Sequence, residues 1–252
     1  MLHFCKHTLI KRILKRVQKN FKYKKLNGFY LVYNDQVNEW LIIPESRANI
    51  YYYGHEQNIV DIVKSSLDKN MVFIDIGAFI GFYTILASKL GAIVYSFEPD
   101  PRSYILLKLN LYLSGLIKKA FTFNIAIGDA KGTITFKLAN SYAESSATNY
   151  LSEDKIVGLV KVPVITLDDF VTEYNIDRVN LIKIDVEGYG ANVLDGALNI
   201  INIYQPNIIF EVHRFDSDIE LKKLLYIKYK YKYRIKMLEY RNNRNFIVYL
   251  YK

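Results

Sequence analysis

Short apolar segments alternate with longer amphipathic segments through the middle of the chain. The apolar segments, each predicted to be a strand, cover residues 71–76, 92–97, 121–127, 179–184 and 207–212. Near-continuous apolar strands separated by amphipathic helices form parallel sheets that are covered on both faces. The pattern therefore predicts an α/β fold with a mostly parallel sheet. Hydrophobic residues make up 51% of the 252, which supplies a core and excludes disorder for most of the chain.

The C-terminal end has a different pattern. From Lys228 to Met237 the even positions are Lys or Arg, and the odd positions are Tyr, Ile or Met. A period of two predicts a strand with one solvated face. With residues 246–251 this strand is expected to form a hairpin that closes the sheet in an antiparallel manner. Two other segments, 51–64 and 191–202, are each predicted to be a single helix.

The net charge of +9 is concentrated at the N-terminus. Residues 1–25 contain nine Lys or Arg and no acid, which leaves 34 − 9 = 25 basic residues against 25 acidic ones in the rest. The basicity therefore belongs to an appendage and does not indicate a nucleic-acid-binding domain. We expect three parts: a basic amphipathic helical extension over 1–25, N-terminal strands with an entry helix over 26–60, and the main domain over 61–252.

Residues 8–19 carry an apolar stripe at helical spacing, with basic residues on the other face. Such a helix packs on its own domain or lies on an anionic membrane surface, and contact with RNA is a third alternative. The apolar run is too short for a signal peptide or a spanning helix. We therefore expect a cytoplasmic protein, with peripheral membrane contact through 8–19 as an alternative. The single cysteine, Cys5, excludes an internal disulfide and cysteine-based zinc or redox motifs.

Acids and glycines follow the first two strands of the main domain. Asp75 and Gly77 end the first strand, Gly81 opens the next helix, and Glu98 ends the second strand, 21 residues after Gly77. An acid at this offset accepts hydrogen bonds from a ribose diol, and Asp75 is placed to meet a cationic amine. The G-x-G-x-x-G of a pyrophosphate site is missing, so a positively charged nucleoside such as S-adenosylmethionine fits better than NAD. Both acids also have a structural interpretation without a ligand. Asp75 would then cap a turn or helix, and Glu98 would be an acid that precedes the N-terminus of a helix.

The segment 73–99, FIDIGAFIGFYTILASKLGAIVYSFEP, resembles the cofactor half of the FkbM-type methyltransferases, which depend on S-adenosylmethionine. Four later segments are similar to further motifs of that family, in the same order: 124–129, 166–169, 181–188 and 210–213. The resemblance implies a Rossmann-like class I methyltransferase fold, mostly parallel with a C-terminal antiparallel hairpin. It also makes 61–252 the methyltransferase domain.

The resemblance implies which residues contact the cofactor. These are Asp75, Gly77, Ala78, Gly81, Tyr83, Thr84, Glu98, Pro99, Asn124, Ala126 and Asp185. Tyr53 and Glu56 are expected at the cofactor entrance. Two positions depart from the family pattern: Phe79 stands where Asn is common, and Gly190 stands where Glu is common. The first departure removes a polar contact near the methionine end, and the second alters the acceptor site or a helix start.

The reaction that the resemblance implies is methyl transfer to a hydroxyl of a small-molecule, glycan or lipid-linked acceptor. An alcohol must lose its proton as it attacks, which calls for a base or a metal ion. The candidate catalytic residues lie at the ends of the last two parallel strands: Asp185, Glu187, Glu211, His213 and Lys183. His213 or Asp185 is predicted to be the base. Glu187 and Glu211 are expected to orient the acceptor, and Lys183 to pair with a carboxylate.

Several alternatives stay open. Asp185, Glu211 and His213 also suit a divalent cation that lowers the pKa of the acceptor, whereas a purely structural histidine is the simpler interpretation of His213. A methyltransferase of RNA or protein, docked by the basic tail, is a second function. A non-catalytic module that binds S-adenosylmethionine at a membrane is a third. The Asn-Pro-Pro-Tyr motif of amino-directed nucleic-acid enzymes is absent, so nucleic acid is not the expected partner.

Overall fold

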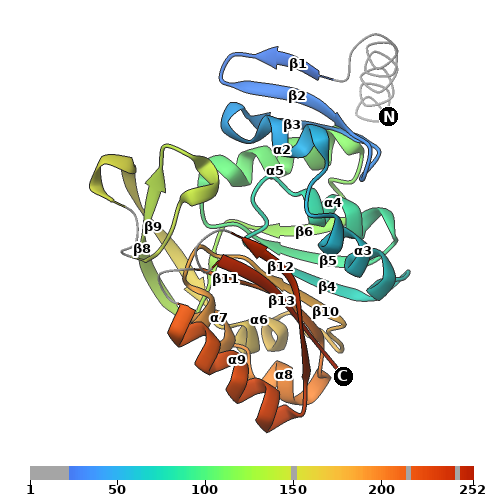
Figure 1. Cartoon of the computed structure of the whole chain (residues 1–252), viewed down its shortest axis with the longest axis vertical. Coiled ribbons are helices and arrows are strands. Elements are labelled where there is room, and N and C mark those ends of the chain that lie inside the picture. The colour runs from blue at the N-terminus through green and yellow to red at the C-terminus, as the bar shows by residue number, and fades with distance from the viewer. Residues whose placement is uncertain (1–22, 149–151, 214–216, 242–244) are drawn as a thin grey trace.

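A computed structural model describes residues 23–148, 152–213, 217–241 and 245–252 (Figure 1). The helix expected over residues 8–19 lies outside the described residues. At the centre is a seven-stranded sheet in the order β12-β13-β11-β10-β4-β5-β6. Its strands are β4 (Val72–Ile76), β5 (Ile93–Phe97), β6 (Ala120–Phe123), β10 (Leu181–Ile184), β11 (Asn207–Val212), β12 (Arg234–Arg241) and β13 (Asn245–Tyr251).

The strands from β11 to β6 run parallel to one another, and β13 and β12 continue the sheet in an antiparallel manner. Every residue of β4 and of β10 is buried. Burial of this kind is typical of parallel strands whose two faces are both covered by helices. The predicted α/β fold, with a mostly parallel sheet and a C-terminal antiparallel hairpin, is confirmed.

Helices cover both faces of this sheet (Figure 1). One face packs against α3 (Gln57–Ser66), α4 (Phe82–Lys89) and α5 (Pro101–Ser114), and the other against α6 (Leu167–Glu173), α7 (Gly190–Asp195), α8 (Leu198–Tyr204) and α9 (Ser217–Tyr231). Because side chains alternate along a strand, Phe73 of β4 belongs to the first core and Ile74 and Ile76 to the second. No helix in the described ranges combines the length and the apolar composition that crossing a bilayer requires.

A smaller antiparallel sheet, in the order β1-β2-β3, lies against the α5 side of the molecule (Figure 1). Its strands are β1 (Tyr23–Leu26), β2 (Phe29–Asn34) and β3 (Glu39–Pro44), and α2 (Ala48–Tyr53) follows them. Asn110 of α5 attaches this sheet to the main core, since its side chain accepts from Ile42 N–H at 2.7 Å and donates to Ile42 O at 3.1 Å. Val32 and Leu41 extend the same apolar core.

A third sheet, in the order β7-β9-β8, leaves the carboxyl edge of the main sheet. It contains β7 (Ala126–Ile127), β8 (Gly132–Ala139) and β9 (Ile156–Ile165). The prediction of one strand over 121–127 is therefore wrong, since β6 ends at Phe123 and β7 pairs with β9. Asn124 lies at the break, where its amide donates to the carbonyls of Glu98 (2.7 Å) and Pro99 (3.1 Å). These bonds hold the chain at the end of β5 instead of continuing the ladder.

The prediction of one strand over 228–237 is wrong in its first half, because α9 continues to Tyr231 and β12 begins only at Arg234. Along α9 the buried positions are Glu220, Leu224, Ile227 and Tyr231, whereas Tyr229 is exposed. This spacing of three and four is helical. The alternation of Lys and Tyr matched a strand because the last turn of α9 places Lys228, Tyr229 and Lys230 between the buried Ile227 and Tyr231.

The two predicted single helices are each two helices, because a glycine breaks them. Between α2 and α3 the chain turns at Gly54, whose φ of 113° is open chiefly to glycine. Between α7 and α8 it passes Gly196, where a Cβ would lie 1.9 Å from the carbonyl oxygen of Gly128. The close approach of these two backbones ends α7.

Candidate active site

A cavity of about 440 Å³ opens at the carboxyl ends of β4, β5, β10 and β11. These strand ends contribute Gly77 and Ala78, Glu98 and Pro99, Asp185 and Glu187, and Glu211. Parallel sheets bind ligands in crevices at this edge, and the volume falls in the range of small-molecule sites. The strand order therefore brings Glu98, a predicted cofactor acid, and the predicted catalytic acids into one cavity.

Glu98, at the end of β5, has a buried carboxylate that the backbone orients. Phe79 N–H donates to its Oε2 at 2.7 Å, and Asp100 N–H donates to its Oε1 at 2.8 Å. Burial outweighs these hydrogen bonds and raises the pKa of Glu98 to about 8. A carboxylate that is oriented but poorly solvated is stabilised by further hydroxyl donors, such as a ribose diol.

The turn after β4 needs its glycines. Gly77 has a φ of 79°, and a Cβ there would lie 1.8 Å from the carbonyl oxygen of Asp185, so this position brings β4 and β10 together at the cavity floor. Gly81 precedes α4 with a φ of 87°, and a Cβ there would meet Leu107 of α5 at 3.1 Å. Phe79, the position that departs from the family pattern, lines the cavity between these glycines. Its backbone supports Glu98 although its side chain is apolar.

Asp75 is 1% exposed and is not part of the described cavity lining. It shares the sheet face of Phe73, where Thr84 Oγ1 donates to its Oδ2 at 2.8 Å. Burial raises the pKa of Asp75 more than Lys183 and Thr84 lower it. The cavity lining also does not include Gly81, Thr84 or Asn124. A direct contact of these three residues and of Asp75 with the cofactor therefore stays a prediction.

Lys183 compensates the buried acids on this face. In the parallel register it is opposite Asp75, and its Nζ donates to Asp185 Oδ2 at 2.9 Å. Burial would lower the pKa of Lys183, but Asp185, Asp75 and Glu56 outweigh burial and raise it. The expected pairing of Lys183 with a carboxylate is present, and it fixes Asp185 at the cavity edge.

The α2–α3 connection closes the same part of the cavity. Glu56 lines the cavity and accepts a hydrogen bond from Tyr83 Oη of α4, while Lys183 Nζ lies 5.1 Å from the Tyr83 ring centroid. Glu56 is therefore at the expected entrance. Tyr53 is 83% exposed and is not among the residues that line the cavity, so its place at the entrance stays a prediction.

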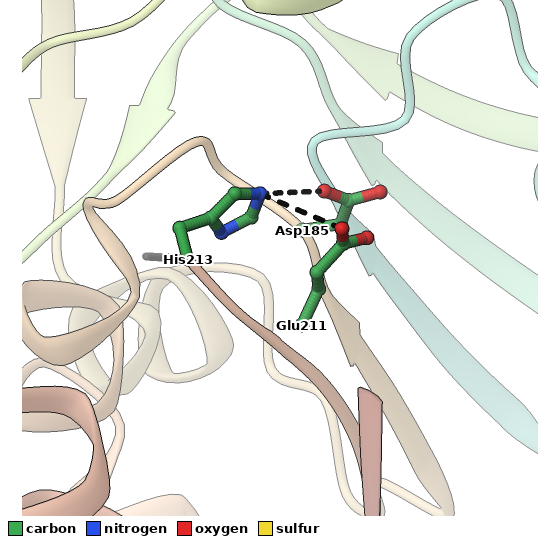
Figure 2. Close-up of side chains that lie close together, drawn as sticks. All are labelled: Asp185, Glu211 and His213. Atoms are coloured by element: carbon green, nitrogen blue, oxygen red, sulfur yellow. Dashed lines mark ion pairs between the residues drawn. The ribbon is translucent and has the colours of Figure 1, made fainter. Parts of the chain in front are cut away.

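His213 follows β11, and its imidazole faces the acids at the strand ends (Figure 2). Its Nε2 lies 3.5 Å from Glu187 Oε2, 3.7 Å from Glu211 Oε1 and 3.9 Å from Asp185 Oδ1. Burial would lower the pKa of His213, but Glu187, Glu211 and Asp185 outweigh burial and raise it. Three carboxylates thus surround one imidazole beside the cavity.

The sequence analysis missed Glu220 of α9, which is fully buried. His213 N–H donates to its Oε2 at 2.8 Å, so Glu220 fixes the backbone that carries the imidazole. A Cβ at position 190 would lie 2.7 Å from Glu220 Oε1 and 2.4 Å from the ring of Phe210. The departure at Gly190 therefore leaves space that an acid from another helix fills. The spacing of Glu220 relative to Leu224 and Ile227 was the available signal.

Comparisons with known proteins agree with this arrangement. Residues 75–245 match the family described as the methyltransferase FkbM domain. The hexuronic acid methyltransferase AglP of Haloferax volcanii is 25% identical over 171 residues, which cover 68% of this chain and 67% of AglP. The 2-O-methyltransferase NoeI of Sinorhizobium fredii is 29% identical over 116 residues, 41% of this chain and 46% of NoeI.

Among solved structures, the methyltransferase FkbM from Methylobacillus flagellatus KT matches with a TM-score of 0.52 and 15% identity. The match covers 86% of this chain and 57% of that chain, and at this identity it supports the fold alone. The chain thus spans less than half of NoeI and little more than half of the solved structure. Because the family match covers more than half of the chain and includes the strand ends of the cavity, the protein belongs to the FkbM family of methyltransferases, as its motifs predicted.

Proposed function

We propose that this protein transfers a methyl group from S-adenosylmethionine to a hydroxyl of a sugar-type acceptor, free or lipid-linked. The observation that carries the proposal is that one cavity joins the oriented carboxylate of Glu98 to the acids around His213. Membership of the FkbM family supports methyl transfer. The names of the hexuronic acid methyltransferase AglP and the 2-O-methyltransferase NoeI support a sugar hydroxyl as acceptor.

The β4–β5 half of the cavity suits the cofactor. Glu98 would accept from the ribose hydroxyls, and Gly77 and Ala78 would let the nucleoside approach the backbone. Pro99 and Ala126 add apolar surface beside Glu98. When bound, S-adenosylmethionine supplies an activated sulfonium methyl, so the protein's main tasks are alignment and deprotonation.

The β10–β11 half suits the acceptor. Glu187 and Glu211 line the cavity and would accept hydrogen bonds from neighbouring sugar hydroxyls. Asp185 and His213 are the candidates for removing the hydroxyl proton, and Lys183 keeps Asp185 in place. The cofactor and acceptor halves meet at Asp185, which adjoins the backbone of Gly77.

The first test is calorimetry with S-adenosylhomocysteine. We expect one site per chain, weakened by Glu98→Gln and unchanged by Glu173→Gln, which makes the same carboxyl-to-amide change at an exposed residue paired with Lys131. The second is transfer of a labelled methyl group to hexuronic acids, neutral sugars, lipid-linked glycans and RNA, with the methylated atom located by NMR. Methylation of a nitrogen atom would overturn the proposal. So would methylation of RNA when none of the sugar or glycan acceptors is methylated.

A further inference from the structure

Asp185, Glu211 and His213 each offer one ligand atom within 4.8 Å of the others. His213 Nε2 lies 3.7 Å from Glu211 Oε1 and 3.9 Å from Asp185 Oδ1, and Figure 2 shows all three atoms converging. These distances are too long for hydrogen bonds. Two ligands that each lie about 2.1 Å from one ion are separated by roughly 3 to 4.2 Å, depending on their angle. The spacing therefore matches atoms that share a cation.

The state of the imidazole is an independent observation. The His213 side chain is 7% exposed, and neither of its ring nitrogens has a hydrogen-bond partner among the described residues. Leaving buried polar atoms unsatisfied is costly, and such groups in native proteins usually have a partner. An imidazolium held directly by carboxylates would draw at least one oxygen into hydrogen-bond range. A metal ion between Nε2 and the carboxylate oxygens satisfies Nε2 without that contact.

The charges favour a cation at the same point. Asp185 presents Oδ2 to Lys183 at 2.9 Å and Oδ1 to His213, so its two oxygens face different partners. Glu211 and Glu187 bring two more carboxylates to the imidazole. Carboxylates of like charge repel one another when they are desolvated, and a divalent cation relieves that repulsion.

We propose that Asp185, Glu211 and His213 bind a divalent cation of the Mg²⁺ or Mn²⁺ class, which holds the acceptor hydroxyl in the methyl-transfer cavity. Mixed carboxylate and imidazole donors suit these ions, and an ion-bound hydroxyl loses its proton more readily. The hydroxyl proton passes to Glu187, the oxygen forms its bond to the methyl carbon, and the carbon–sulfur bond breaks with its electron pair on sulfur. In this arrangement His213 is a ligand and not the general base. The inference rests on the proposed function for its acceptor.

The test is Mn²⁺ binding to the full chain, followed by electron paramagnetic resonance of the ion in solution. We expect one bound Mn²⁺ per chain, displaced by Mg²⁺, in the absence of cofactor and acceptor. His213→Ala and Glu211→Gln should each weaken binding at least ~10-fold, while Glu173→Gln changes nothing. Glu211→Gln nearly keeps the shape of the side chain, so the test remains decisive if His213→Ala does not fold. Unchanged affinity in Glu211→Gln, or no bound Mn²⁺ at millimolar ion, would overturn the proposal.

A second measurement separates the cation from the proposed function. Methyl transfer to a sugar acceptor should be lost in EDTA and restored by Mg²⁺, while affinity for S-adenosylhomocysteine in EDTA is unchanged. Transfer that continues undiminished in EDTA overturns the cation's role and leaves the methyltransferase proposal standing. Mn²⁺ bound at the three residues without any cofactor binding supports the cation site and overturns the proposed function.

Discussion

The raised pKa of Glu98 makes cofactor binding depend on pH with a defined sign. With a pKa of about 8, only about 10% of the ligand-free molecules carry an ionised Glu98 at pH 7. Ribose hydroxyls donate to the ionised form, so a bound nucleoside draws the pKa back toward its ordinary value. Binding of S-adenosylhomocysteine at pH 7 should therefore release about 0.9 proton. The Kd should fall about 50-fold between pH 6 and pH 8 and level off above that.

Calorimetry in two buffers of different ionisation enthalpy measures the released protons directly. Glu98→Gln should bind more weakly at pH 8 and lose the pH dependence, because the amide cannot ionise. Glu173→Gln, which removes an exposed carboxylate, should keep the full dependence. A wild-type Kd that is constant from pH 6 to pH 8 would refute the reasoning, as would an equal proton release in the Glu98→Gln variant.

Three further perturbations test the fold and the site. Lys183→Met should lower the free energy of unfolding by about 3–5 kcal/mol in urea titrations, since it leaves Asp75 and Asp185 uncompensated. Lys183→Arg keeps the positive charge and should retain most of that free energy. A loss below ~1 kcal/mol in Lys183→Met would contradict the buried charge network. Gly190→Ala should cost about 1–3 kcal/mol, because the added Cβ lies 2.4 Å from a phenylalanine ring, and an unchanged melting temperature would argue against that packing. Removing residues 1–22 should leave the affinity for S-adenosylhomocysteine within about twofold of that of the full chain, since the first described residue that lines the cavity is Arg47. A tenfold loss of affinity, about 1.4 kcal/mol, would place part of the cofactor site in residues 1–22.

The mostly parallel character of the sheet could be inferred from the sequence because its central strands are predominantly apolar, whereas the order of the strands came from the structure. Val72–Ile76 and Leu181–Ile184 need cover on both faces, and only helices on both sides of a sheet provide it. The alternation at residues 228–231 misled for the opposite reason. The exposed residues of a surface helix need not repeat with the helical period, so they can alternate as the residues of a strand do. The four buried positions of α9 do have helical spacing, but one of them is an acid, which weakens the apolar pattern.

For the site, the motifs predicted which strand ends carry acids but not which way each acid points. Asp75 and Glu98 both end a strand, yet Asp75 faces Thr84 and Lys183 inside the core while Glu98 lines the cavity. Sequence spacing gives the face of a strand only when its register and its neighbours are known. Glu220 escaped notice because it reaches His213 from α9, of which the sequence pattern assigned only the end, residues 228–231, and that to a strand.

The linear order of residues was sufficient for the class of fold, the family and the edge of the sheet where ligands bind, since periodicity and glycine-bounded turns are local properties. Tertiary structure alone decided that Lys183 offsets two acids, that Glu98 is buried enough to hold a proton near neutral pH, and that His213 meets carboxylates from two strands. These features depend on distances between segments far apart in the chain and on the water that packing removes. Neither quantity is written in any short stretch of sequence.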